Sequence, residues 1–427
     1  MARKEDIRIK RTRVKSDASA EKPAEQPAPR FAGMQYENEL EEAARAAAEK
    51  RAARQKKPKT KKRLIILAVI VLLVVLVWAK WDVLNPTSVW TWLNVVVTGG
   101  ESGDGYPTEA EGSNVIAMRP VGGYLLVVTQ NTVTVYNQSA GTVLTRTHSF
   151  SDPLVDVSGS AIMLAEIGGR RVEVQTVGGK PHSIETEKNI VSAAVSDNGS
   201  VAVVTDSDKS HISEIMFYNS KGEATLHCSS SEALLTGIAL RSDGRQMAAI
   251  GVLADNGAPQ SRVLVYSTFS EKDPKVYSGN DVLLCDVKYL GNDNIAAVGD
   301  DRLWVVKTGK NEPTEITYEN RRLLSWSVSD DRVGLILQSY GATDGGELLA
   351  VDKSGKEAYT VAFSGMFRGI APAGKEFFLL NGNEVLTMNA KGETQTQEVI
   401  PDALRVCRAF GNDALVLGLT SIERYDY

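Results

Sequence analysis

The sequence predicts an all-β fold, an eight-bladed β-propeller, preceded by a single transmembrane helix and a cytoplasmic tail. Three observations predict it. A unit of about 41 residues repeats eight times, which is a propeller-blade period. An uncharged apolar run, Leu64 to Ala79, interrupts the chain. The charge changes sign across that run: residues 1–63 hold 19 Lys+Arg and 10 Asp+Glu, and residues 64–427 hold 29 and 43, giving net charges of +9 and −14.

The composition sets outer limits on the class of protein. The 427 residues are 43% hydrophobic and 24% charged, which excludes a wholly disordered chain and a multi-span membrane protein. Three cysteines, Cys228, Cys285 and Cys407, exclude a disulfide-stapled secreted domain. Their scatter predicts buried or half-buried thiols.

The N-terminal part is predicted to be cytoplasmic. Residues 1–35 mix charges with three prolines and have little that could form a core, so we expect a disordered basic tail. Residues 36–60 are rich in Ala, Glu, Arg and Lys and predict a charged helix. A solvated helix is the simpler interpretation of 36–57, and a docking helix for a cytoplasmic partner is the alternative.

Residues 61–82 predict a transmembrane helix that acts as a signal anchor. The sixteen-residue run covers about 24 Å as a helix, and flanking Arg63 and Lys80 extend the span towards the roughly 30 Å hydrocarbon core. Trp78 and Trp81 stand where interfacial aromatics are expected. A buried core helix should show a polar face, and a signal peptide should have a short basic start and a small-residue cleavage site. Neither feature is present.

The positive-inside rule gives the orientation of this helix. Eight Lys or Arg between positions 51 and 63 precede the apolar run, against Lys80 alone close behind it. We therefore expect a cell-membrane protein with a cytoplasmic N-terminus and an extracellular C-terminal domain. The basic flank has no interleaved aromatics, so contact with the lipid bilayer explains it and no nucleic-acid partner is expected.

Residues 83–105 predict a juxtamembrane interfacial helix and a linker. Asn85 and Pro86 fit a helix start, Trp90 and Trp92 would anchor it in the outer interface, and Gly99 with Gly100 would end it. A first strand of the outer domain is the alternative, because the stretch VVVT at 95–98 has β character.

Residues 106–427 contain the repeat and predict the propeller. Each copy has an inner strand, a Gly/Asp/Asn turn, a more apolar strand, a third alternating strand and a polar outer strand. The last copy ends at its third strand, so 106–112 (YPTEAEG) should supply its outer strand and close the ring. Seven blades is the alternative count. The copies start at Val115, Leu154, Val191, Leu235, Leu284, Leu323, Met366 and Leu404.

No arrangement of residues indicates catalysis, a metal or a cofactor. The four histidines form no HxxxH or HExxH pair, and the Asp-rich turns at 196–199 and 242–244 lack EF-hand spacing and predict hairpin turns. Innermost strands line a propeller channel, and aligning the copies places polar residues there. These candidate ligand-binding residues at the channel mouth are Arg119, Asp156, Asp286, Lys288, Ser325, Arg368 and Arg408. Water in the channel would also require polar walls without any ligand.

Three segments carry a resemblance to a known family: GDGYPTEAEGSNV (103–115), THSFSDPLVDVSG (147–159) and NIVSAAVSDNGSVAVVT (189–205). They resemble a bacterial family of uncharacterised proteins, domain of unknown function 5711. The resemblance implies a basic N-terminus, one membrane-spanning helix and a propeller-like outer domain. It implies no catalytic residues, because the family has no accepted activity. More distantly, the repeats resemble WD40-type and quinoprotein-type propellers, but the quinoprotein blade motif is absent.

These features favour a non-enzymatic interaction scaffold in the cell envelope, tethered to the membrane and binding an envelope protein. The first alternative is an extracytoplasmic sensor for a cell-wall fragment or small molecule. The second is a hydrolase that uses the channel carboxylates Asp156 and Asp286, which lie three blades apart.

Overall fold

The computed structural model divides the chain into two compact units, residues 1–76 and 77–427. It describes Arg45 and residues 103–426, apart from 208–210, 256, 271, 390 and 412. Arg45 is helical and exposed. The expectations for 1–35, 36–60 and 61–82, and for 83–105 as far as residue 102, otherwise lie outside the described residues. Among those described, no helix has the length and apolar character needed to cross a membrane.

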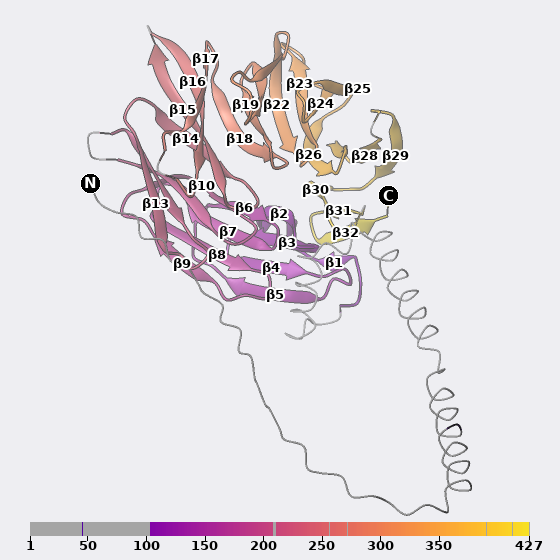
Figure 1. Cartoon of the computed structure of the whole chain (residues 1–427). Coiled ribbons are helices and arrows are strands. Elements are labelled where there is room, and N and C mark those ends of the chain that lie inside the picture. The colour runs from indigo at the N-terminus through magenta and orange to yellow at the C-terminus, as the bar shows by residue number, and fades with distance from the viewer. Residues whose placement is uncertain are drawn as a thin grey trace, which may run out of the picture. The chain divides into compact units, whose positions relative to one another are not determined.

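The described residues of the second unit form eight four-stranded antiparallel sheets, which are the blades of a propeller (Figure 1). The predicted count of eight is therefore correct. In the first four blades the strands, from inner to outer, are β2 (Val115–Val121), β3 (Tyr124–Thr129), β4 (Thr132–Tyr136) and β5 (Thr142–Thr147); β6 (Pro153–Ser158), β7 (Ala161–Glu166), β8 (Arg171–Thr176) and β9 (His182–Glu185); β10 (Ile190–Val195), β11 (Val201–Asp206), β12 (Ser213–Tyr218) and β13 (Ala224–Ser230); β14 (Leu234–Leu240), β15 (Gln246–Asp255), β16 (Ala258–Ser267) and β17 (Lys275–Asn280).

Blades five to eight repeat the same order. Their strands are β18 (Leu284–Leu290), β19 (Asn294–Gly299), β20 (Arg302–Lys307) and β21 (Thr314–Thr317); β22 (Arg321–Val328), β23 (Arg332–Ser339), β24 (Gly346–Asp352) and β25 (Glu357–Phe363); β26 (Phe367–Ala373), β27 (Glu376–Asn381), β28 (Glu384–Met388) and β29 (Thr394–Val399); β30 (Arg405–Arg408), β31 (Ala414–Leu417), β32 (Ser421–Tyr425) and β1 (Thr108–Glu109). A short 3₁₀ turn, Gly112–Asn114, joins β1 to β2.

The ring closes as the sequence predicts. β1, from the start of the domain, pairs antiparallel with β32 from its end, with Thr108 opposite Ile422. Backbone N–H groups of Ala110 and Gly112 continue the link by donating to Thr420 and Leu419 carbonyls, both at 2.9 Å. Blade eight therefore contains both ends of the propeller sequence, and β1 covers the outer edge of β32.

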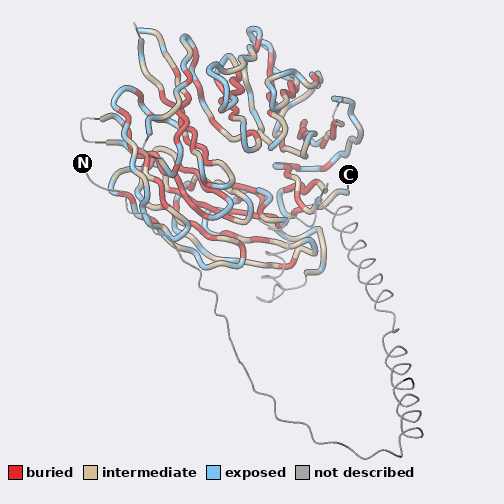
Figure 2. Tube along the Cα trace, viewed as in Figure 1, coloured by how far each residue is buried: buried red, intermediate tan, exposed pale blue. Residues whose placement is uncertain are grey.

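The core consists of eight apolar clusters, one at each interface between neighbouring blades. The second strand of a blade is covered on both faces by its neighbours, which explains why β3, β7, β11, β19 and β27 are almost continuously apolar and buried. Outer strands such as β5 and β21 have exposed, polar residues instead (Figure 2).

Because consecutive strands of a blade run antiparallel, the connections between them lie at the two ends of the ring. We name these two ends by the direction of the inner strands. The leading face is the end at which the inner strands begin, and it carries the second-to-third strand connections. The trailing face is the end at which the inner strands finish, and it carries the inner-strand hairpin turns.

Candidate functional site

The innermost strands surround the central channel, and an ion pair crosses it. Lys288 of β18 in blade five places its Nζ 3.1 Å from Asp156 Oδ1 of β6 in blade two. The Lys288 side chain remains 43% exposed and that of Asp156 17%. The Asp156 carboxylate raises the pKa of Lys288, and the nearby Asp286 adds to this effect. The two blades are therefore tied to each other through the channel.

Both channel carboxylates are occupied by hydrogen bonds. Asp156 Oδ2 accepts from the Val195 N–H of blade three at 3.1 Å. Asp286 Oδ2 accepts from Trp326 Nε1 of blade six at 2.7 Å, and its Oδ1 accepts from the Val287 N–H at 2.8 Å. The carboxylates thus fix neighbouring inner strands relative to one another.

Arginines occupy the other side of the channel, on three consecutive blades. Arg368 of β26 donates to the Ala403 carbonyl at 3.1 Å, and Arg405 of β30 donates to the Val115 carbonyl at 3.3 Å. Arg119 of β2 is exposed and lies close enough to Arg405 for its charge to act there. Burial first, and then the charge of Arg119, lowers the pKa of Arg405.

The structure groups some of the expected channel residues and separates others. Asp156, Asp286 and Lys288 are brought together, and Arg119 acts electrostatically on Lys288. Arg408 instead bonds to the Gly411 carbonyl in the trailing-face turn of blade eight. Ser325 is half-buried in β22. The expected interface residues Arg63, Trp78, Lys80, Trp81, Trp90 and Trp92 lie outside the described residues.

Sequence reasoning missed two channel residues, Trp326 and Arg405. Both fall outside the columns compared between repeats. In the segment LLSWSV at 323–328, Trp326 lies between two serines of a predicted inner strand. A large aromatic residue in such a polar stretch could have indicated a channel contact. Within the described residues, no group of three or more His, Cys, Asp or Glu could hold a metal ion.

Exposed large apolar side chains gather on the leading face. Of twelve among the described residues, eight lie at this end of the ring and belong to seven different blades. Leu234, Leu283 and Met366, which are 47%, 41% and 68% exposed, stand at the starts of inner strands and so beside the channel mouth. The eight are Ile167, Ile212, Leu234, Leu283, Tyr340, Met366, Val399 and Leu419.

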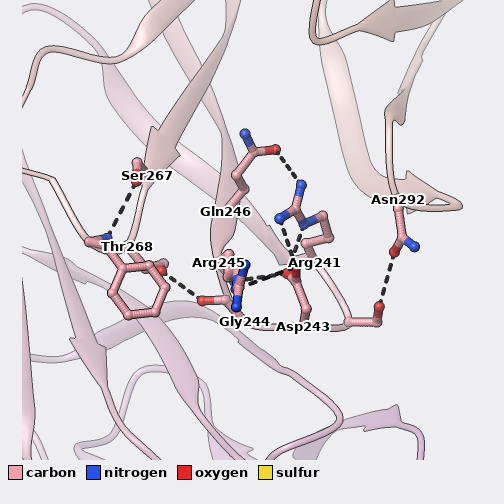
Figure 3. A network of polar contacts seen from close by, with 10 residues as sticks. Arg241, Asp243, Gly244, Arg245, Gln246, Ser267, Thr268 and Asn292 are labelled. Carbon is pink, nitrogen blue, oxygen red and sulfur yellow. Dashed lines mark hydrogen bonds and ion pairs between the residues drawn. The ribbon is translucent and has the colours of Figure 1, made fainter.

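The trailing face is polar and held together by its own hydrogen bonds. In blade four, Arg241 donates to both oxygens of Asp243 at 2.7 Å, and Asp243 Oδ1 also accepts from the Arg245 N–H at 2.9 Å (Figure 3). Hydrogen bonding from Arg241 lowers the pKa of Asp243. The sequence prediction that 242–244 forms a hairpin turn is confirmed.

The same turns link neighbouring blades. Ser242 Oγ donates to Asn292 Oδ1 of blade five at 3.2 Å, and the Asp197 N–H of blade three donates to the Ser242 carbonyl at 2.9 Å. Ser158 of blade two in turn donates to Asp197 Oδ1 at 2.5 Å. Asp197 and Asp243 of this face therefore have structural partners.

The described residues define a closed, eight-bladed β-propeller whose channel is crossed by an ion pair. The chain belongs to the family of unknown function DUF5711, which matches residues 101–422. No curated protein matches it.

Three solved structures are similar to this chain at low sequence identity. The C-terminal WD40 domain of Sif2 is 13% identical with a TM-score of 0.50, covering 75% of this chain and 98% of that one. AztD from Citrobacter koseri is 13% identical with a TM-score of 0.48, covering 73% and 89%. Hydrazine synthase of Kuenenia stuttgartiensis is 13% identical with a TM-score of 0.43, covering 74% and 97%.

Proposed function

We propose that this protein is a single-pass membrane protein whose propeller lies outside the membrane and acts as a docking scaffold for another envelope protein. The leading face is the docking surface. The observation that carries the proposal is the concentration of exposed apolar side chains on this one end of the ring. Soluble surfaces scatter such residues singly, and their clustering marks interaction sites.

The chemistry of the two faces supports this choice of surface. On the leading face, Leu234, Leu283 and Met366 stand at the starts of three inner strands. Their side chains are wholly apolar, so contact with water does not favour their exposure. On the trailing face, by contrast, Asp197, Asp243 and Ser242 are already hydrogen-bonded to other side chains. A partner would bury apolar area on the leading face without first breaking hydrogen bonds.

The membrane anchor rests on the apolar run 64–79 and its basic N-terminal flank. A net charge of −14 from residue 64 onward favours solubility of the outer part. This overall charge does not identify a partner, so the apolar residues of the leading face are the basis for partner selection in this proposal. The ion pair through the channel and the hydrogen-bonded channel carboxylates favour a rigid scaffold over a hydrolase.

We expect the triple variant Leu234→Asp/Leu283→Asp/Met366→Asp to lose its partner. Intact cells would be treated with a membrane-impermeant crosslinker, and proteins attached to the full chain would be quantified by mass spectrometry. The amount of crosslinked partner recovered with the triple variant should fall at least about tenfold relative to wild type. Each new carboxylate would have to lose its hydration for the partner to bury that surface.

Phe269→Asp is the matched control. Phe269 is 79% exposed but lies in the β16–β17 connection on the trailing face, so the same chemical change there should leave partner recovery unchanged. Equal recovery from the triple variant and the control would contradict the docking surface. Crosslinking that occurs only after lysis would contradict the proposed position of the propeller outside the membrane.

A further inference from the structure

We propose that the channel wall formed by blades seven, eight and one binds an anionic group, either a carboxylate or a phosphate. Arg368, Arg405 and Arg119 would bind it. They come from the inner strands of these consecutive blades, and none of them belongs to the apolar residues that form the proposed docking surface.

The three guanidinium groups have no acidic partner. Within the described part of the chain, none of them forms an ion pair, whereas Arg146, Arg241, Arg262, Arg302, Arg321 and Arg424 all do. Arg368 and Arg405 each bond to one backbone carbonyl of the next blade, which orients the side chain but leaves its charge uncompensated. All three residues are exposed, so a ligand can reach them.

Neither channel acid, Asp156 or Asp286, forms an ion pair with an arginine of this wall among the described residues. Asp156 is engaged by Lys288 and the Val195 N–H, and Asp286 is engaged by Trp326 and the Val287 N–H. The positive charges of Arg119 and Arg405 consequently act on each other, and that repulsion contributes to the lowered pKa of Arg405. An anion between them would replace repulsion by attraction.

The chemistry of the side chains defines the ligand class. A guanidinium presents five N–H donors in a planar fork that matches carboxylate and phosphate oxygens in pairs. Among the described residues, Arg368 and Arg405 each donate one hydrogen bond to the protein itself, which leaves several N–H groups for a ligand. Outside the cytoplasmic part the chain carries −14, so this positive wall is a local exception to its overall charge.

Calorimetric titration of the full-length chain in detergent tests the proposal. Sodium phosphate and sodium citrate are the two probes, each at an ionic strength matched with sodium chloride. We expect saturable binding of at least one of them, and the better probe identifies the group as phosphate or carboxylate. Absence of saturable binding by both would overturn the proposal.

Two variants and a control separate binding from folding. Arg119 is exposed and its side chain makes no hydrogen bond within the described part of the chain, so the Arg119→Gln variant should fold normally and bind the anion more weakly. Arg119→Gln/Arg405→Gln should weaken binding at least about tenfold, because charge-assisted hydrogen bonds are lost. Arg245→Gln changes a 69% exposed arginine on the trailing face and should bind as wild type. Wild-type affinity in the double variant would overturn the assignment.

Discussion

Replacing Trp304 by alanine is expected to lower the free energy of unfolding by about 3–5 kcal/mol, the usual cost of truncating a buried tryptophan. Trp304 lies in β20 with no exposed surface, in the apolar cluster between blades four and five. Denaturant unfolding of the purified chain, followed by circular dichroism, measures the loss.

Gly279 provides the control for this effect. It lies in β17 of blade four, and a Cβ at this position would stand 2.2 Å from Trp304 Cζ2. Gly279→Ala alone should therefore destabilise by about 1–3 kcal/mol through overpacking. With Trp304→Ala the clash disappears, so the double variant should be more stable than the sum of the two losses implies. Simple additivity would contradict this packing.

A chain that ends after Gly418 is expected to lose the cooperative unfolding transition of the propeller. The shortened chain lacks β32, which joins β31 to β1 and buries Ile422 between blades eight and one. The four residues of β31 are buried, and without β32 they would form an apolar edge open to pairing with other molecules. Size-exclusion chromatography with light scattering should detect aggregation.

A chain that ends at Tyr425 is the matched control. It loses only residues beyond β32 and keeps the pairing of Thr108 with Ile422. This chain should elute as the full-length protein does and unfold at nearly the same temperature. If both shortened chains behaved like the full-length protein, the β1–β32 pairing would not be what closes the ring.

The architecture was predictable because each blade repeats the same physical solution. An apolar second strand, a polar outer strand and a glycine-containing turn are local patterns, and eight copies make them unambiguous. The prediction that 106–112 closes blade eight followed from counting strands, and β1 confirms it. Cys285, predicted to be buried or half-buried, is exposed, because it lies near the start of the inner strand at the channel.

The channel was less predictable because its geometry depends on β-bulges and distant contacts. Six inner strands have a register shift near their start, whereas none is recorded in β6 and β30. Comparing columns across bulged and unbulged strands therefore mixes side chains that face different directions. Nor can the sequence alone show that Lys288 meets Asp156, since 132 residues separate them and only ring closure brings them together.

The proposed role depends above all on the propeller lying outside the membrane, and Cys285 allows a direct measurement. Cys285 is an exposed residue, whereas Cys407 is buried and this burial raises the pKa of its thiol to about 12. Burial, with the charges of Asp300 and Asp286, raises the pKa of the Cys285 thiol above its ordinary value, so the fraction present as reactive thiolate increases with pH.

The measurement is labelling of intact cells with a membrane-impermeant maleimide at several pH values. We predict that the wild-type chain is labelled before lysis, faster at higher pH, and that Cys285→Ser removes most of the signal. Labelling of Cys285 only after the cells are lysed would contradict an outward-facing propeller and, with it, docking of an envelope partner on the leading face.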